Sequence, residues 1–107
     1  REIWLGVNAI DYSGYPDCRP EYIAAFEAMA NLATREGVEG RGVSILTPLS
    51  RLDKTGIVNR AFELGVPLEH THSCYDPVES GASCGRCDAC LLRARGFDGA
   101  NRTDPAP

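Results

Sequence analysis

Four cysteines, whose side chains can bind metal, gather in the last third of the chain, at Cys74, Cys84, Cys87 and Cys90. Their spacing is C-x9-C-x2-C-x2-C. Two-residue gaps let a tight turn direct neighbouring sulfurs at one point, and zinc takes four thiolates in a tetrahedron at about 2.3 Å. The pattern therefore predicts a structural zinc site that leaves no open position for a catalytic water.

Two local features favour this interpretation. Gly85 lies in the first short gap, where a turn can require the positive φ that glycine adopts at little cost. Cys90 is expected in the first turn of a helix, whose partial positive charge favours a thiolate.

Three other interpretations of the cysteines stay open from the sequence. Disulfides are typical of secreted proteins, and the chain as given shows no signal peptide. Iron–sulfur clusters use similar spacings, but in ferredoxin-type runs proline follows the last cysteine, whereas here Leu91 does. His70 and His72 lie just upstream and could compete as ligands, although the alternation His-Thr-His is more typical of a strand end.

A second candidate site is the segment 11–19, which is rich in groups that stack and hydrogen-bond. Tyrosine rings can stack on a planar ligand, aspartates can accept its N–H groups, and an arginine can pair with a carboxylate or phosphate. The alternative is a packed surface loop with its own turns. The candidate substrate-binding residues here are Asp11, Tyr12, Ser13, Tyr15, Asp17 and Arg19.

Two further side chains are weaker candidates. Cys18 lies just before an expected helix, which would favour a reactive thiolate, but a small buried cysteine is the commoner case. Lys54 opens the second expected helix, where the helix dipole does not favour a cation. It is therefore a candidate for binding phosphate or substrate, with a solvated lysine as the alternative.

Composition limits the classes of function. The chain has 107 residues, which is one domain at most, and a net charge of −4. An acidic chain lacks the general electrostatic attraction that nucleic-acid binding needs, so no direct nucleic-acid partner is expected.

No apolar run approaches the roughly 18 residues that a membrane span requires. Clustered free cysteines fit a reducing cytoplasm. The first residue is Arg1 rather than methionine, which suggests a fragment or a processed chain.

Hydrophobic periodicity predicts the elements that would position these residues. Strands are expected at 3–10, 43–46 and 66–71, and helices at 21–35, 53–64 and 88–95. Gly65 and Gly96 are expected to stop the second and third helices, and the polar tail from residue 98 is expected to be disordered.

This β–α–β–α–β order predicts an α/β fold with a parallel sheet, flanking helices and a C-terminal metal-binding loop and helix. Ligands of such sheets bind beyond the carboxyl ends of the strands. Segments 11–19 and 70–74 should leave the first and third strands at that edge. They are therefore predicted to flank one crevice.

The chain lacks a phosphate-binding loop of the Walker type and a G-x-G-x-x-G motif. The glycine-rich run at 37–42 follows an expected helix rather than a strand, and so predicts a turn. No Ser–His–Asp arrangement stands out either.

Several runs together closely resemble the 7-cyano-7-deazaguanine synthases, the QueC/ExsB family, over nearly the whole chain apart from the tail. Two shorter matches are Asp53-Lys54 and His-Thr-His-Ser-Cys-Tyr at 70–75. The two longest are Val-Asn-Ala-Ile-Asp-Tyr-Ser-Gly-Tyr-Pro-Asp-Cys-Arg-Pro at 7–20 and Cys-Gly-Arg-Cys-Asp-Ala-Cys-Leu-Leu-Arg at 84–93.

The resemblance implies an enzyme that uses ATP, with Mg²⁺, to convert the carboxylate of 7-carboxy-7-deazaguanine into a nitrile with ammonia, for queuosine in tRNA. It implies part of a Rossmann-like, adenine nucleotide alpha hydrolase-type fold and one zinc held by the four cysteines. By the same resemblance, Tyr12 and Tyr15 would frame the deazapurine, and Asp11 or Asp17 would bond its polar edge. A homodimer is compatible with it.

The family's ATP-binding loop, of Ser-Gly-Gly-x-Asp-Ser type, is absent from this sequence. The chain therefore resembles the C-terminal half of such an enzyme and is expected to be inactive alone. The expected division is residues 1–72 for the α/β part, 73–97 for the zinc module and 98–107 for the tail. Smaller departures from the family are His72, where tryptophan or another residue is common, and the proline-ended tail. Two alternatives remain: a zinc-knuckle binding module, and a related pyrophosphatase-loop enzyme with another substrate.

Overall fold

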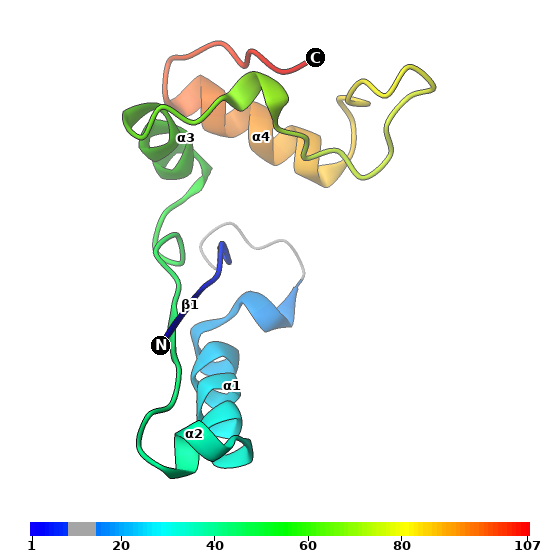
Figure 1. Ribbon diagram of the computed structural model, residues 1–107. Helices are drawn as coiled ribbons and strands as arrows, with labels where there is room; N and C mark the ends of the chain where they lie inside the picture. The colour runs from blue at the N-terminus through cyan, green and yellow to red at the C-terminus, as the bar shows by residue number, and fades with distance from the viewer. Residues whose placement is uncertain (9–14) are drawn as a thin grey trace. The chain divides into compact units, whose positions relative to one another are not determined.

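The computed structural model describes residues 1–8 and 15–107 (Figure 1). It divides into two compact units, residues 1–51 (unit 1) and residues 52–107 (unit 2). The expected division after residue 72 differs from this one. Helix α3 (Lys54–Glu63) packs against helix α4 (Asp88–Gly99), so the chain from residue 52 onward shares a unit with the metal-binding loop.

Unit 1 contains a parallel pair of short strands, β1 (Glu2–Trp4) and β2 (Ser44–Leu46). Ile3 pairs with Ile45 in the register. The connection between them carries a 3-10 turn η1 (Pro16–Cys18) and helices α1 (Pro20–Ala33) and α2 (Arg35–Val38). The α/β arrangement with a parallel sheet and flanking helices is therefore confirmed.

Strand β1 is shorter than the predicted strand 3–10. The ladder continues only to the Leu5 N–H, which donates to the Leu46 carbonyl at 2.9 Å. Pro48, two residues beyond Leu46, has no N–H to donate, so the segment after β2 cannot continue the hydrogen-bond ladder with the chain after β1. Residues 9–14, the rest of the predicted strand and part of the loop, lie outside the described residues.

Side chains of α1 occupy the outer edge of β2. The amide of Asn31 bonds both backbone groups of Val43, accepting from its N–H and donating to its carbonyl at 2.9 Å each. The Glu27 carboxylate accepts the Ile45 N–H at 2.6 Å. Alternate residues of a strand direct their backbone groups to opposite edges, so helix α1 here takes the place that a third strand would fill.

The predicted third strand, 66–71, is wrong. This segment instead forms a 3-10 turn, η2 (Leu68–His70). The Val66 N–H closes the end of α3 on the Ala61 carbonyl at 2.9 Å, and Pro67 has no N–H for a ladder. Within the described ranges the sheet has two strands. The predicted crevice between segments 11–19 and 70–74 depended on this strand and loses its basis.

In unit 2, each of the two longer helices begins at a residue whose side chain caps it. Asp53 accepts the Gly56 N–H at 2.7 Å at the start of α3, as predicted, and Cys87 caps α4. Gly65 follows α3 with a φ of +66°. Gly96, however, does not stop α4, which runs on to residue 99.

Gly96 lies where α4 comes close to α3. A Cβ at Gly96 would stand 2.9 Å from the Lys54 Cβ and 3.0 Å from the Lys54 carbonyl oxygen. A bare backbone is therefore needed there for contact between the helices. The glycine serves packing within α4 rather than ending it.

The segment 100–107, called the strap below, belongs to unit 2, follows α4 and runs back beside it (Figure 1). The guanidinium of Arg102 lies 4.0 Å from the centre of the Phe62 ring, and Asp104 pairs with Arg93. The prediction that the tail is disordered from residue 98 is therefore wrong. The polar composition of the strap suggested disorder, because the sequence did not reveal that side chains of α3 and α4 bind Arg102 and Asp104.

The buried core is small. Its hydrophobic members are Ile45 in unit 1 and Val58, Cys74, Cys90 and Phe97 in unit 2. Phe97 meets Phe62 edge to face at 6.3 Å between ring centres. Half of the buried set in unit 2 is therefore cysteine. None of the described helices is long and apolar enough to cross a membrane.

Candidate metal centre

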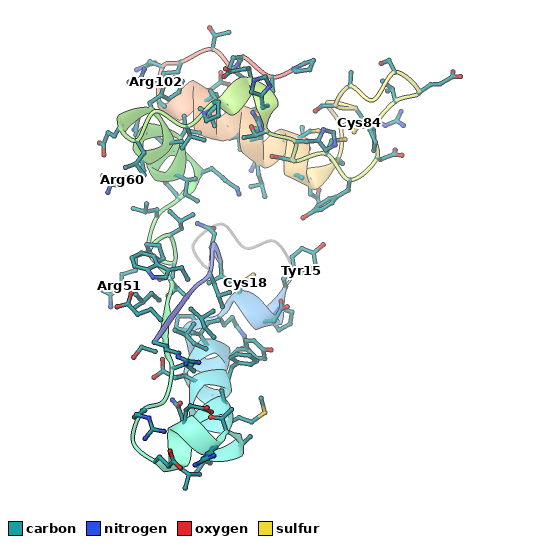
Figure 2. All side chains as sticks on the ribbon, in the orientation of Figure 1. Tyr15, Cys18, Arg51, Arg60, Cys84 and Arg102 are labelled. Atoms are coloured by element: carbon teal, nitrogen blue, oxygen red, sulfur yellow. The ribbon has the colours of Figure 1, made fainter. Side chains whose placement is uncertain are left out.

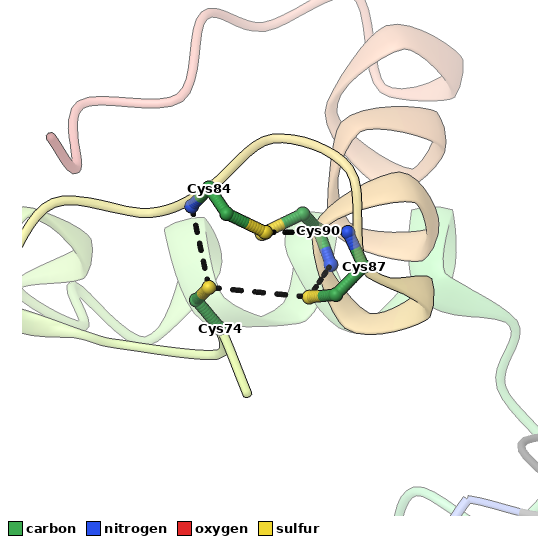
Figure 3. Close-up of side chains that lie close together, drawn as sticks. All are labelled: Cys74, Cys84, Cys87 and Cys90. Atoms are coloured by element: carbon green, nitrogen blue, oxygen red, sulfur yellow. Dashed lines mark hydrogen bonds between the residues drawn. The ribbon is translucent and has the colours of Figure 1, made fainter. Parts of the chain in front are cut away.

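The structure brings the four clustered cysteines together. The sulfurs of Cys74, Cys84, Cys87 and Cys90 all lie within 4.8 Å of one another (Figure 3). The Cys74 and Cys87 sulfurs are 3.9 Å apart. Four ligands at about 2.3 Å in a tetrahedron would stand about 3.8 Å apart. The donor set and its spacing therefore fit a tetrahedral zinc ion.

Different elements deliver the four sulfurs. Cys74 follows η2, Cys84 ends the loop, and Cys87 and Cys90 lie at the N-terminal end of α4. Gly85 has a φ of +73°, as the sequence predicted for the turn between Cys84 and Cys87. This turn reverses the chain so that both sulfurs face the same point.

Backbone N–H groups surround the sulfurs. The Cys74 sulfur accepts from Asp76 at 3.4 Å and from Cys84 at 3.3 Å. The Cys84 sulfur accepts from Arg86 at 3.4 Å and from Cys87 at 3.3 Å. Such bonds stabilise negative charge on sulfur and orient the ligands, as outer partners do in metal sites.

These surroundings shift the thiol pKa values in opposite directions. The backbone N–H of Tyr75, followed by that of Cys90, lowers the pKa of the Cys87 thiol to about 6. The Arg86 N–H lowers the pKa of Cys84. Burial raises the pKa of the Cys90 thiol to about 12. In this closed arrangement, the N–H groups around Cys87 favour the thiolate that a metal needs, whereas burial favours the protonated form of Cys90, which must lose its proton when a metal binds.

The structure argues against disulfides and against histidine ligands at this site. All five cysteines lie in described parts of the chain and carry free thiols, and 3.9 Å is far beyond the bond length of about 2.05 Å in a disulfide. The His72 ring bonds the Cys74 carbonyl through Nε2 at 3.1 Å. Of the residues described, the group able to hold a metal contains the four cysteines and neither His70 nor His72.

The predicted substrate-binding loop is described only in part. Asp11, Tyr12 and Ser13 lie outside the described residues. Tyr15 caps η1, and its carbonyl accepts the Cys18 N–H at 3.1 Å. Figure 2 labels Tyr15 and Cys18 at this turn. Tyr15 and Asp17 are exposed, whereas Cys18 is half-buried.

Arg19 and Lys54 are the two remaining candidates for substrate binding. The Arg19 Nε donates to the Pro16 carbonyl at 3.2 Å, which holds one side of the guanidinium at the loop. Lys54 is the first residue of α3 and is half-buried beside Gly96. It belongs to unit 2, whereas the loop belongs to unit 1.

Sequence reasoning missed the polar group beside the metal cluster. Arg93 donates to the Ser73 hydroxyl and to the Asp104 carboxylate, at 3.1 and 2.8 Å. Arg93 lies three residues after Cys90, one helical turn away, which was the available signal. Its acceptor in the strap could not be identified from spacing.

Comparison with known proteins places the chain in a family. The family model of the queuosine biosynthesis protein QueC matches residues 1–101. The 7-cyano-7-deazaguanine synthase of Citrifermentans bemidjiense is 61% identical over 104 residues, which is 97% of this chain and 46% of the relative. That of Solidesulfovibrio magneticus is 63% identical over 105 residues, covering 97% of this chain and 45% of the relative. That of Aromatoleum aromaticum is 59% identical over 106 residues, covering 99% and 47%.

The chain thus spans about half the length of the curated relatives it matches. The match takes in the metal cluster and the loop before α1 alike, and it agrees with the resemblance seen in the sequence. The chain belongs to the QueC family of queuosine biosynthesis proteins.

Proposed function

We propose that this chain supplies the C-terminal, substrate-and-zinc part of a 7-cyano-7-deazaguanine synthase. The observation that carries the proposal is the identity of about 60% to synthases across almost the whole chain, together with the four converging thiols. The complete enzyme would be an ATP-dependent carbon–nitrogen ligase. It would convert 7-carboxy-7-deazaguanine and ammonia into the 7-cyano product.

The proposed reaction activates the same carbon twice. The substrate carboxylate attacks ATP and becomes an acyl adenylate, with pyrophosphate leaving; ammonia then displaces AMP to give an amide. The amide oxygen then attacks a second ATP, with pyrophosphate and a proton leaving, and loss of AMP with the remaining N–H proton leaves the nitrile. Mg²⁺ would accompany ATP, whose binding loop this sequence lacks.

Zinc would have a structural role in this scheme. Four thiolates complete a tetrahedral site and leave no position for water or substrate. Cys74, Cys84, Cys87 and Cys90 would hold the ion and fix the loop between η2 and α4. Four free thiols also need a reducing compartment such as the cytoplasm.

The loop before α1 would bind the deazapurine. We propose that Tyr12 and Tyr15 stack on its ring and that Asp11 or Asp17 accepts its N–H groups. The exposed carboxylate of Asp17 and ring of Tyr15 leave these groups accessible to a ligand. Ser13, Arg19 and Lys54 would bond the polar groups of the substrate or a phosphate.

The test joins this chain to the ATP-binding half of a relative and follows 7-cyano-7-deazaguanine by mass spectrometry. We expect product only with both halves, ATP and ammonia, and none from residues 1–107 alone. Asp17→Ala should raise KM or lower kcat at least about tenfold, because an interaction with the substrate is lost. Glu21→Ala, a nearby exposed carboxylate on α1, is the matched control.

Product formed without the added half would refute the need for it. Normal turnover and substrate affinity in Asp17→Ala would remove Asp17 from the binding site. If the joined protein binds zinc but never forms the nitrile, the activity proposal fails, and a related enzyme with another substrate or a zinc-binding module becomes the better explanation.

A further inference from the structure

We propose that Arg93 is a positioning residue of the metal centre. It ties the helix that carries Cys90 to the residue before Cys74, and the strap holds it in place. This inference rests on metal binding by the four cysteines, which is part of the proposed function, and does not depend on the reaction.

Arg93 spans the two chain segments that deliver the ligands. It lies on α4 one turn after Cys90, and its side chain is only 15% exposed. Its Nη1 donates to the Ser73 hydroxyl at 3.1 Å, and its Nη2 reaches the Leu68 carbonyl at 3.4 Å. Ser73 precedes Cys74 directly. One guanidinium therefore connects α4 to both η2 and the start of the metal loop.

The strap orients this guanidinium. Asp104 receives two hydrogen bonds from it, from Nη2 at 2.8 Å and from Nε at 2.5 Å. A paired arrangement of this kind fixes the plane of the group as well as its position. The Ala106 N–H donates to the Asp104 Oδ1 at 3.0 Å and restrains the carboxylate in turn.

The surroundings of the Arg93 guanidinium stabilise its positive charge. The hydrogen bond to Asp104 and the charge of that carboxylate raise the pKa of Arg93. The guanidinium also lies 5.4 Å from the centre of the Phe97 ring, the most buried side chain of the core. Arg93 is thus anchored to the core one helical turn after Cys90, and its cation offsets part of the negative charge that thiolates bring.

A second contact joins the strap to the other side of the metal loop. The Ser83 N–H donates to the Pro107 carbonyl at 3.4 Å. Ser83 precedes Cys84, just as Ser73 precedes Cys74. The strap therefore reaches, directly or through Arg93, the residues that come before two of the four ligands.

The consequence concerns how long the metal stays bound. Zinc leaves a closed site when its ligands separate, and Arg93 opposes separation of Cys74 from Cys90. Partners that orient ligands commonly change metal affinity by about 10–100-fold. Arg93 acts one residue away from a ligand, so we expect an effect near the lower end of that range.

The test measures zinc release from the metal-loaded protein into excess chelator with a colorimetric indicator. Arg93→Met should release zinc about tenfold faster than the unmodified protein. Ser73→Ala and Asp104→Asn should accelerate release in the same direction. These two variants preserve the test if Arg93→Met does not fold. Asp104→Glu, which keeps the carboxylate, should restore much of the effect lost in Asp104→Asn.

Arg102→Met is the matched control. It removes a strap arginine that packs on Phe62 and makes no contact with the ligand segments among the interactions described. We expect it to lower the melting temperature while leaving the release rate near normal. Co²⁺ in place of zinc gives a second readout, because its visible absorption responds to ligand geometry. The spectrum should shift in Arg93→Met and not in Arg102→Met.

Three results would overturn the inference. One is unchanged release in the Arg93, Ser73 and Asp104 variants. Another is equal acceleration by Arg102→Met, which would indicate general destabilisation. The third is failure of the unmodified protein to bind zinc or Co²⁺ at all. A protein that binds zinc and shows the expected differences but forms no nitrile would leave this inference standing while the proposed reaction fails.

Discussion

Cys87 caps the helix that carries Cys90. Its sulfur accepts the Cys90 N–H at 3.5 Å and lies among the four sulfurs of the cluster. One side chain therefore begins α4 and offers a ligand to the metal. The start of the helix and the geometry of the cluster are fixed by the same atom.

Substituting Cys87 can separate these two roles. Serine keeps an oxygen that can cap the helix, whereas alanine removes both cap and ligand; loss of a helix cap alone costs about 1 kcal/mol. With saturating zinc, held by the three remaining cysteines, Cys87→Ser should therefore keep more of α4 than Cys87→Ala, as measured by circular dichroism. Both should lose more metal affinity than the roughly 10–100-fold that follows loss of an outer partner, since a ligand is lost. Equal helix content in the two variants would contradict the capping role.

Removing the metal should unfold at least residues 74–90. Cys74 and Cys90 supply half of the buried hydrophobic set of unit 2, and closing the loop without an ion must overcome its conformational entropy. We expect the amide signals of this segment to collapse to random-coil positions in a strong chelator and to return when zinc is restored. Signals that stay dispersed would rule out structural zinc.

Metal affinity should rise with pH, because protons compete with metal for the thiolates. Each thiol still protonated in the metal-free protein adds about a tenfold change per pH unit. Since this segment is unfolded without metal, its thiols have the ordinary pKa of a free thiol, above neutral pH, and stay mainly protonated from pH 5 to 8. Co²⁺ titrations over this range should therefore show a steep and continuous rise in affinity.

The Cys87→Ser variant is the control for this dependence. Serine does not ionise in this range, so one proton fewer competes with the metal, and the slope should fall by about a factor of ten per pH unit. An unchanged slope in the variant would contradict a ligand role for Cys87.

Gly96→Ala should destabilise unit 2. An exposed helical glycine usually gains about 0.5–1 kcal/mol on replacement by alanine, but here the new Cβ would meet Lys54 at 2.9 Å. Pushing α3 away from α4 should cost about 1–3 kcal/mol, which reverses the sign. Chemical denaturation of the zinc-loaded protein measures the change. Gly6→Ala, whose Cβ would meet nothing within 4 Å, should leave stability nearly unchanged.

Asn31→Leu should destabilise unit 1. The amide of Asn31 satisfies both backbone groups of Val43, and leucine would leave them without these partners. Unsatisfied backbone groups cost about 1–3 kcal/mol where water cannot replace the bond. Denaturation followed by Trp4 fluorescence reports on this unit. Asn59→Leu, an exposed position on α3, is the matched control, and equal losses in the two variants would contradict the edge contact.

The sequence by itself determined the features that depend on nearby residues. The short cysteine gaps and Gly85 specify a turn that brings the sulfurs together, and Asp53 specifies where α3 begins. These features need only local backbone geometry and capping, which spacing reveals. The parallel pairing of β1 with β2 also followed from the order of elements, because a helix between two strands favours a parallel crossover.

The tertiary structure decided what depends on partners distant in the chain. Gly96 looked like a helix stop, yet it continues α4 because Lys54 approaches it. The segment 66–71 looked like a strand, but Pro67 and the end of α3 leave it a 3-10 turn, while α1 covers the edge of β2. The strap looked disordered until Arg93 supplied a partner for Asp104. Periodicity reports which residues can be buried or helical, whereas close approach and ion pairing exist only once the chain is folded.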